Sequence, residues 1–396
     1  MTAATPQGIS PEEVGQWADE FQAIWRQLGA TIRRRDTRSR VEQYTRGLLG
    51  RIDRKNGWQL AEYTGDDDPS AMQHVLDRAD WDADKIRDEL RRYAAEHLLA
   101  HGEGGVLVMD ETGFMKKGEK SVGVNRQYSG TAGKIDNCQI GVFLALVGSR
   151  GRALVDRELY LPKEWCDDEP RCHEAKVPPE TKFATKPQLA QKMFARALES
   201  GLTPAWALMD EVYGNDGKLL RFLEARKQPY IAAVSLQQRV EIGGLSKRLD
   251  IVAKEVPPEC WVRLSAGEGL KGPRLFDWAA MPASTLAEDG FRRWALFRRS
   301  VENPKELAYY RCLAPEGAGL KDLVEAAGQR WSIECCFEAA KQETGLGGYE
   351  VRSWHGWYRH ITLSMFALAF LAAVRAASAE AALGALTKKT IRRWSR

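Results

Sequence analysis

The sequence predicts a mixed α/β protein that begins with an all-helical unit. Apolar and aromatic residues recur at helical spacing over 14–28, and further helical stretches follow at 37–50 and 83–100. Two short apolar runs, 106–109 and 205–209, predict buried strands. The order strand, strand, strand, helix, strand, helix, strand beyond residue 100 predicts a mixed sheet with helices on its faces.

The remaining elements follow from local patterns. Besides the two apolar runs we expect strands at 121–128, 138–147 and 230–236 and helices at 186–200 and 215–227. Proline and glycine punctuate 237–317, and 294–300 with 307–313 predicts a hairpin, so this region is expected to be a β-rich insertion. One helix is expected from Gly319 to about Thr344, where glycines end it, and a final apolar helix over 356–378.

Composition places the chain among globular proteins, with 396 residues, 44% hydrophobic and 28% charged. The net charge of +4 is mild, but basic residues cluster. Residues 33–55 contain nine Lys or Arg, among them Arg33, Arg34 and Arg35, against three acids, and 388–396 contain five basic residues and no acid. Such clusters attract phosphate backbones, although a solvated helix face explains each of them equally well.

Cysteine usage and hydropathy bear on location. The seven cysteines form no repeated CxxC pair, which favours a reducing cytosol, and the N-terminus has no secretory pattern. The longest apolar run, Ile361–Val374, is shorter than the roughly 20 residues that span a bilayer. We therefore expect a cytoplasmic protein with a buried helix here and no membrane partner.

Both apolar runs end in the same three residues, Met-Asp-Glu, at Asp110 and at Asp210. A carboxylate at a strand end lies at the sheet rim, where ligands of α/β sheets collect. Magnesium prefers carboxylate, water and phosphate oxygens, so two such aspartates can share an ion. The common alternative is that a strand-end aspartate begins a turn. Glu111 and Glu211 should point away if the strands continue through them.

A third acid lies on the helix expected from Gly319. Arg330, Glu334 and Lys341 fall on one helical stripe. The stripe is either an ordinary ladder of ion pairs or a metal ligand between two groups that can bind phosphate. Glu338, one turn further along, remains a rival to Glu334.

These residues resemble a known family, the DDE transposases of bacterial insertion sequences. One branch ends in the motif Y-x-x-R-x-x-x-E-x-x-x-x-x-x-K, which Arg330, Glu334 and Lys341 match, whereas Ala327 stands at the tyrosine position. The chain is most similar to the IS701 group. The stretches that carry this similarity are 109–114, 133–139, 157–162, 210–214, 349–352 and 357–363.

The resemblance implies a function and a site. The fold would be an RNase H-like catalytic core interrupted by the β-rich insertion. The enzyme would be a polynucleotidyl transferase that binds terminal inverted repeats of double-stranded DNA, cuts them and joins them to target DNA. Asp110, Asp210 and Glu334 would hold two Mg²⁺ ions, for which Mn²⁺ can substitute, and Arg330 and Lys341 would grip phosphates. A synaptic homodimer in the bacterial nucleoid is expected.

The residue patterns together with the resemblance suggest a division of the chain. The expected parts are a helical DNA-binding domain (1–100), a catalytic core in two segments (101–236 and 318–380), the insertion (237–317) and a basic tail (381–396). Further DNA contacts are expected from Arg298 and Arg299 of the hairpin, which alternatively solvate an edge strand. Tyr358, Arg359 and His360 are also expected to contact DNA, with packing as the alternative for His360.

Two other functions remain open. A metal-dependent nuclease that cuts DNA without strand transfer would use the same three carboxylates. A domesticated DNA-binding protein without catalysis is the other alternative, and the presence of all three acids argues against it.

Overall fold

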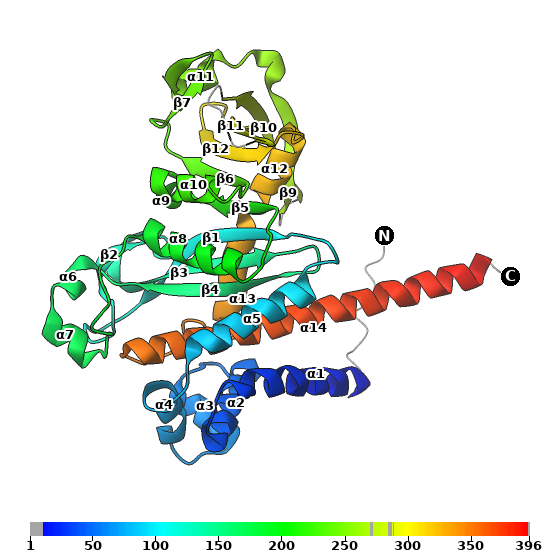
Figure 1. Ribbon diagram of the computed structural model, residues 1–396. Coiled ribbons are helices and arrows are strands. Elements are labelled where there is room, and N and C mark those ends of the chain that lie inside the picture. The colour runs from blue at the N-terminus through cyan, green and yellow to red at the C-terminus, as the bar shows by residue number, and fades with distance from the viewer. Residues whose placement is uncertain (1–10, 270–271, 284–286, 288, 395–396) are drawn as a thin grey trace.

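The computed structural model describes residues 11–269, 272–283, 287 and 289–394, although not the side chains of 11 and 381–394. A large mixed sheet crosses the molecule and carries helices on both faces (Figure 1). The predicted mixed α/β class is therefore confirmed. The basic cluster at 388–396 lies outside the described side chains.

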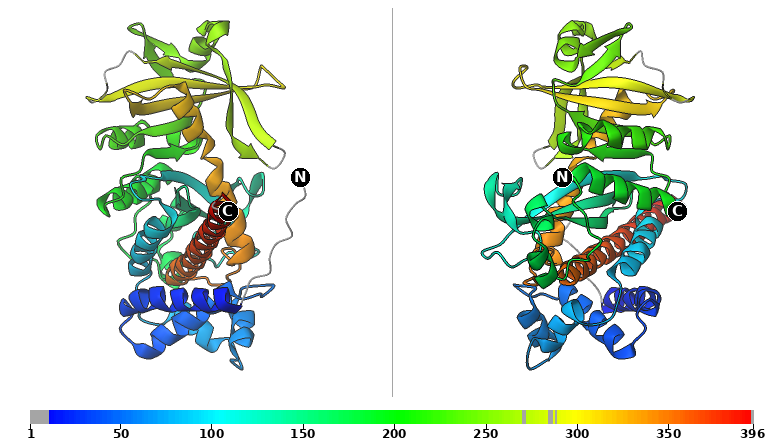
Figure 2. Two further views of the ribbon diagram at one scale, coloured as in Figure 1. Left: turned by 90° about the vertical axis from the view of Figure 1, so that its right-hand side faces the viewer. Right: turned by 60° about the vertical axis from the view of Figure 1, so that its left-hand side comes forward.

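Helices dominate the described part of the first hundred residues, 11–100, as expected. They are α1 (Pro11–Ala30), α2 (Arg35–Leu49), α3 (Gly57–Thr64), α4 (Ser70–Asp77) and α5 (Ala83–Leu98). The Asn56 side chain caps α3 by accepting a hydrogen bond from Gln59 N at 3.1 Å. The buried rings of Phe21 and Trp25 pack against the C-terminal helix, with ring centroids 5.4 Å from Phe370 and 6.4 Å from Phe366 respectively. The N-terminal helices thus share one hydrophobic core with the helical segment 357–374, beside which they lie (Figure 2).

The large sheet has ten strands in the order β2-β3-β1-β5-β6-β12-β11-β10-β9, and β4 also pairs with β3. The strands β1, β5 and β6 run parallel to one another, and the other pairs are antiparallel. The bounds are β1 (Val106–Met115), β2 (Asn125–Ser129), β3 (Lys134–Val147), β4 (Arg152–Tyr160), β5 (Trp206–Met209), β6 (Tyr230–Val234), β9 (Val262–Gly269), β10 (Gly272–Pro282), β11 (Phe291–Ser300) and β12 (Leu307–Pro315).

The two faces of the sheet carry different helices. One face is covered by α8 (Lys186–Glu199), α9 (Glu211–Gly214) and α10 (Gly217–Glu224), and the other by α5, α13 (Trp331–Glu343) and α14 (Trp354–Trp394) (Figure 1). Two short helices, α6 (Lys163–Cys166) and α7 (Glu169–Glu174), follow β4. Helix α14 corresponds to the helix expected at 356–378 and is longer than expected. Its first half packs on β4.

By length and composition alone, the part of α14 from Trp354 to Glu380 could cross a membrane, with a mean hydropathy of 1.8. However, 72% of that apolar window is buried inside the protein. The segment is thus the buried helix that the sequence predicts.

The region 237–317 is built largely of strands, as expected, and also contains a helix that the sequence did not predict. A hairpin of β7 (Arg239–Ile242) and β8 (Leu245–Arg248) leads into α11 (Leu249–Glu255) and a 3-10 turn η1 (Pro258–Cys260). Strands β9 to β12 follow. Because β12 pairs with β6, this region extends the main sheet.

The single helix expected over 319–344 is wrong. The structure has α12 (Leu320–Gly328) and α13, with Gln329 and Arg330 between them. Gly328 packs so tightly on β9 that a Cβ there would lie 2.3 Å from the carbonyl oxygen of Ala266. Arg274 donates a hydrogen bond to the Gly328 carbonyl at 2.9 Å. This close approach ends α12, and the chain continues as α13, which packs on β1, β3 and β4.

Candidate active site

The register of two parallel strands places Asp110 beside Asp210. Met109 of β1 lies opposite Met209 of β5, so each aspartate is the next residue along its strand. Neighbouring strands lie about 4.8 Å apart, so the two backbones stand side by side at the sheet rim. Two acids that are a hundred residues apart in the chain are therefore brought together.

Local hydrogen bonds orient both carboxylates. Asp110 remains within β1, and its Oδ1 accepts a hydrogen bond from Glu111 N at 2.8 Å. Asp210 ends its strand and caps α9, accepting from Val212 N at 3.0 Å. The turn-starting role that the sequence offered as an alternative thus applies to Asp210, and it does not remove the residue from the site.

Both Asp110 and Asp210 are harder to ionise at this rim than in water. Burial raises the pKa of Asp110 to about 7, and the nearby charge of Asp210 contributes, while Arg330 acts in the opposite direction. The pKa of Asp210 is also raised, first by burial and then by Glu111. A further positive charge at this position would stabilise both carboxylates.

Arg330 links Asp110 to Glu334. Its Nη1 lies 3.3 Å from Oδ2 of Asp110, and its Nη2 lies 3.0 Å from Oε1 of Glu334. Glu338 is exposed, and its Oε1 accepts a hydrogen bond from Gln342 at 3.4 Å. Of the two glutamates, Glu334 is the one connected to the aspartates.

Lys341 lies further along the same face of β1. Its Nζ donates a hydrogen bond to Thr112 Oγ1 at 2.8 Å, and Thr112 is two residues beyond Asp110, hence on the same side of the strand. Burial lowers the pKa of Lys341. The stripe Arg330, Glu334 and Lys341 therefore lies along β1, although Arg330 precedes the first turn of α13.

Glu111 points to the opposite face, as predicted. Its two carboxylate oxygens accept hydrogen bonds at 2.5 Å from Lys186 of α8 and from the Tyr213 hydroxyl of α9. Glu211 also lies away from the site, exposed and 3.3 Å from Asn215 Nδ2. Glu111 nevertheless supports the site because it braces α9, which carries Asp210 at its start. Sequence reasoning missed this role, and the signal was Tyr213 within the 210–214 motif.

The side chains fit a divalent cation at the aspartate pair. The carboxylates of Asp110 and Asp210 are adjacent hard oxygen donors, and their two negative charges repel each other. Among the described residues, no three His, Cys, Asp or Glu side chains form a group close enough to hold a metal, and the Arg330 guanidinium stands between Asp110 and Glu334. Joining Glu334 to the pair requires Arg330 to move.

Of the three α14 residues expected to contact DNA, Arg359 and His360 are buried, so the prediction is wrong for these two, while Tyr358 is half-buried and its DNA contact stays a prediction. His360 is fully buried, with Nδ1 2.8 Å from the Tyr44 hydroxyl and Nε2 2.9 Å from the Gly345 carbonyl oxygen. Arg359 is buried and donates to backbone carbonyls of residues 76 and 81. The Tyr358 hydroxyl donates to Glu158 at 3.0 Å. These contacts tie α14 to its neighbours.

The other basic candidates differ in exposure. Arg33, Arg34 and Arg35 are exposed before and at the start of α2. Arg298 and Arg299 are half-buried on β11, which is paired on both sides, so they do not solvate an edge strand. Arg298 lies over the Phe276 ring, and Arg299 pairs with Asp277 at 3.3 Å. A DNA contact by these five arginines stays a prediction.

Comparison with known proteins gives three findings. The profile of the DDE superfamily endonuclease family matches residues 27–246, which contain Asp110 and Asp210. A probable transposase for insertion sequence element IS701 from Microchaete diplosiphon is 30% identical over 197 residues, which cover 50% of this chain and 48% of that protein. The match therefore spans about half the length of this curated relative.

The crystal structure of the NurA nuclease from Sulfolobus solfataricus aligns with 63% of this chain and 80% of that chain, at 12% identity and a TM-score of 0.26. This likeness is too low to carry an argument. The family profile, by contrast, covers more than half of the chain and includes both strand-end aspartates. The chain belongs to the DDE superfamily endonuclease family.

Proposed function

We propose that this protein is a DDE transposase that cuts DNA at the ends of an insertion sequence and joins the released ends to target DNA. The observation that carries the proposal is the placement of Asp110 beside Asp210, with Glu334 attached to Asp110 through Arg330. Membership of the DDE superfamily endonuclease family and the similarity to a probable IS701 transposase support it.

Asp110, Asp210 and Glu334 would hold two Mg²⁺ ions. When bound, such ions activate an attacking hydroxyl and stabilise the charge on the leaving oxygen. Arg330 would exchange its carboxylate partners for phosphate oxygens, which its planar guanidinium binds well. Lys341, which has no carboxylate partner among the described residues, would add a second positive charge to the phosphate backbone.

We assign the catalytic core to an RNase H-like fold. The strands β4, β3, β1, β5 and β6 form a mixed sheet covered by helices on both faces, and its rim carries the two aspartates. The exposed Arg33, Arg34 and Arg35 would contact duplex DNA outside the cleavage site. Two DNA ends must be cut together, so a homodimer on the DNA in the bacterial cytoplasm is part of the proposal.

The test is a cleavage assay on a plasmid that carries the inverted repeats flanking the gene. Asp110→Asn, Asp210→Asn and Glu334→Gln should each reduce Mg²⁺-dependent nicking to background, because each removes a metal ligand. Glu338→Gln is the matched control, and it should cut within about twofold of the parent, as is usual for an exposed site. Full activity of Glu334→Gln would remove that residue from the site.

A second measurement separates transposase from nuclease. The released 3′ ends should become joined to a second, unlabelled plasmid, which changes the size of the labelled product. Cleavage without joining would favour the nuclease alternative. Binding without metal-dependent cleavage would favour a protein that has lost catalysis.

A further inference from the structure

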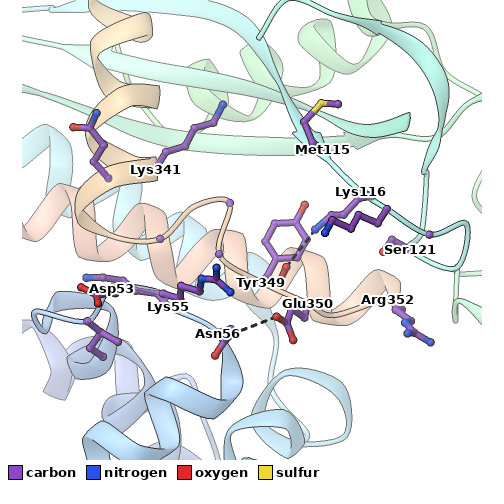
Figure 3. Close-up of a pocket in the computed structure, with 18 of the residues that line it drawn as sticks. Asp53, Lys55, Asn56, Met115, Lys116, Ser121, Lys341, Tyr349, Glu350 and Arg352 are labelled. Atoms are coloured by element: carbon purple, nitrogen blue, oxygen red, sulfur yellow. Dashed lines mark hydrogen bonds between the residues drawn. The ribbon is translucent and has the colours of Figure 1, made fainter. Parts of the chain in front are cut away.

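A cavity of about 700 Å³ opens beside the proposed active site, on the far side of Lys341 (Figure 3). It lies between three segments that are distant in sequence: 52–56 between α2 and α3, 115–121 after β1, and 341–352 between α13 and α14. We refer to it as the 116 pocket, after Lys116 on its wall. Neither the family comparison nor the carboxylate chemistry assigns it a role.

The lining of the 116 pocket is strongly basic. Seven of its nineteen residues are Lys or Arg, and two are acidic. One acid, Glu350, accepts a hydrogen bond from Asn56 at 3.3 Å (Figure 3). The basic residues of the lining thus outnumber the acidic ones, and the pocket carries an excess of positive charge.

Three of these cations have no partner within the described part of the chain. The side chains of Arg54, Lys117 and Arg352 are exposed and make no ion pair or hydrogen bond with any residue that the structure describes. By contrast, Lys120 pairs with Glu174 at 2.8 Å, and Lys55 donates to three backbone carbonyls and is structural. Unpaired cations around a concave surface are typical of sites that bind phosphates.

A fourth cation, Lys116, is held in place on the wall. Its Nζ donates to the Tyr349 carbonyl at 3.2 Å and lies 3.7 Å from the centre of the Tyr349 ring. Burial lowers the pKa of Lys116 to about 8. An anion in the pocket would stabilise the charged form of Lys116 against the effect of burial. Because the ammonium is already held in place, little side-chain entropy would be lost on binding the anion.

Strand β1 connects the pocket to the carboxylates. Asp110 and Thr112 lie on one face of β1, Lys341 contacts Thr112, and Met115 at the strand end lines the pocket. Two strand positions correspond to about 7 Å, so Lys341 stands between the aspartate pair and the pocket at a distance that a nucleotide or two can bridge. Because Thr112 and Phe114 are buried, a DNA strand held at Asp110 would reach the pocket by passing over Lys341 and not along β1 itself.

The geometry points to the 116 pocket as a binding site for the phosphates of a single DNA strand that continues from the cleavage point. This inference rests on the proposed function. A volume of about 700 Å³ is that of a small-ligand site, which holds a few nucleotides of one strand but not the full width of a duplex. Arg54, Lys117 and Arg352 would bind phosphates, with Lys116 and Lys341 fixing the path.

The experiment measures binding of the full-length protein to a fluorescein-labelled oligothymidine of about ten nucleotides, a length typical of single-strand sites. Fluorescence anisotropy is recorded in EDTA, so cleavage plays no part, at roughly 50 to 200 mM NaCl. The test variant is Lys117→Ala with Arg352→Ala. The matched control is Lys218→Ala with Arg221→Ala, which removes one Lys and one Arg from the exposed surface of α10.

The pocket variant should bind about tenfold more weakly, and the slope of log affinity against log salt should fall by about 1.4, because each single-strand phosphate contact contributes about 0.7. The affinity of the control variant should stay within about twofold of the parent, because its two residues lie outside the pocket and make no phosphate contact there. Thermal melting by circular dichroism checks that both variants fold, which is expected because all four side chains are exposed and unpaired among the described residues.

A labelled duplex of the same length is measured alongside. Three outcomes would overturn the inference: no loss of oligothymidine binding in the pocket variant, equal losses in both variants, or a loss for the duplex alone. Cleavage by the Asp110→Asn series is scored separately. If that series retains full cleavage while the pocket variant still loses oligothymidine binding, the proposed catalytic residues are wrong and the pocket stands. If the catalytic variants fail as expected and the pocket variant binds like the parent, only the pocket is wrong.

Discussion

Arg330 lies 3.3 Å from Asp110, and the same guanidinium holds Glu334 at 3.0 Å. A side chain that is expected to grip phosphate thus makes ion pairs with two of the proposed metal ligands. The positive charge stabilises Asp110, whose pKa Arg330 lowers against the effects of burial and of Asp210. Metal ions and Arg330 therefore compete for the same carboxylates.

This competition predicts opposite effects of one substitution. Arg330→Gln should bind Mn²⁺ several-fold more tightly without DNA, because the carboxylates lose a competing cation, yet should cleave DNA less well. Electron paramagnetic resonance of free Mn²⁺ measures the affinity. Lys341→Gln is the control, since Lys341 contacts Thr112 and no carboxylate, and its Mn²⁺ affinity should not change. Weaker Mn²⁺ binding by Arg330→Gln would contradict the competition.

Asp110→Asn should stabilise the metal-free protein at neutral and alkaline pH. The pKa of Asp110 is raised to about 7 in the folded protein, so the stability associated with its protonated form is present below about pH 4 and is lost as pH rises toward 7. Asparagine does not ionise, so the variant keeps this stability, and its free energy of unfolding should exceed that of the parent by ~2–4 kcal/mol above pH 7. Urea unfolding in EDTA at several pH values measures it, and a difference that shrinks as pH rises would refute the assignment.

Gly328→Ala should damage the site from a distance. The new methyl group would meet the Ala266 carbonyl oxygen at 2.3 Å, so α12 must move away from β9. We expect a loss of about 1–3 kcal/mol in unfolding free energy. Cleavage should fall further than the unfolded fraction explains, because Arg330 follows two residues later. Gly317→Ala is the control, since a Cβ there meets no atom within 4 Å.

His360 should make the folded chain sensitive to acid. Burial lowers its pKa from 6.5 to about 4, so its contribution to stability is complete above pH 6.5 and is lost as pH falls toward 4. Between pH 7 and pH 5 the parent should lose about 2 kcal/mol from this group. Urea unfolding of His360→Gln should lack that component, whereas the exposed His101→Gln should retain it.

The sequence was most informative where an apolar run ended in a charge. Asp110 and Asp210 stood out for that reason, and strand pairing placed them together. It was least informative where charge is buried. Strand β4 was not predicted because it contains Asp156, Arg157 and Glu158, which resemble surface residues but are buried among arginines such as Arg196, 2.9 Å from Asp156.

Two other predictions were wrong because they depend on side-chain burial and on a close backbone contact, which the sequence does not show. Arg359 and His360 lie beside tryptophans in the sequence, a pattern shared by DNA contacts and by buried polar groups, and only the packing of α14 decides between them. The break between α12 and α13 depends on the backbone of β9, more than sixty residues earlier, which presses on Gly328. Neither effect is encoded in local periodicity.

The pairing of Met109 with Met209 has a consequence for divergence among related chains. The loops and helices between β1 and β5 can gain or lose residues without moving either acid, because the hydrogen-bonded ladder alone fixes where the strands end. One residue inserted inside β1 or β5 would instead turn its aspartate to the opposite side of the sheet. Natural relatives should therefore vary freely in the number of residues separating the two acids, while tolerating no length change within either strand.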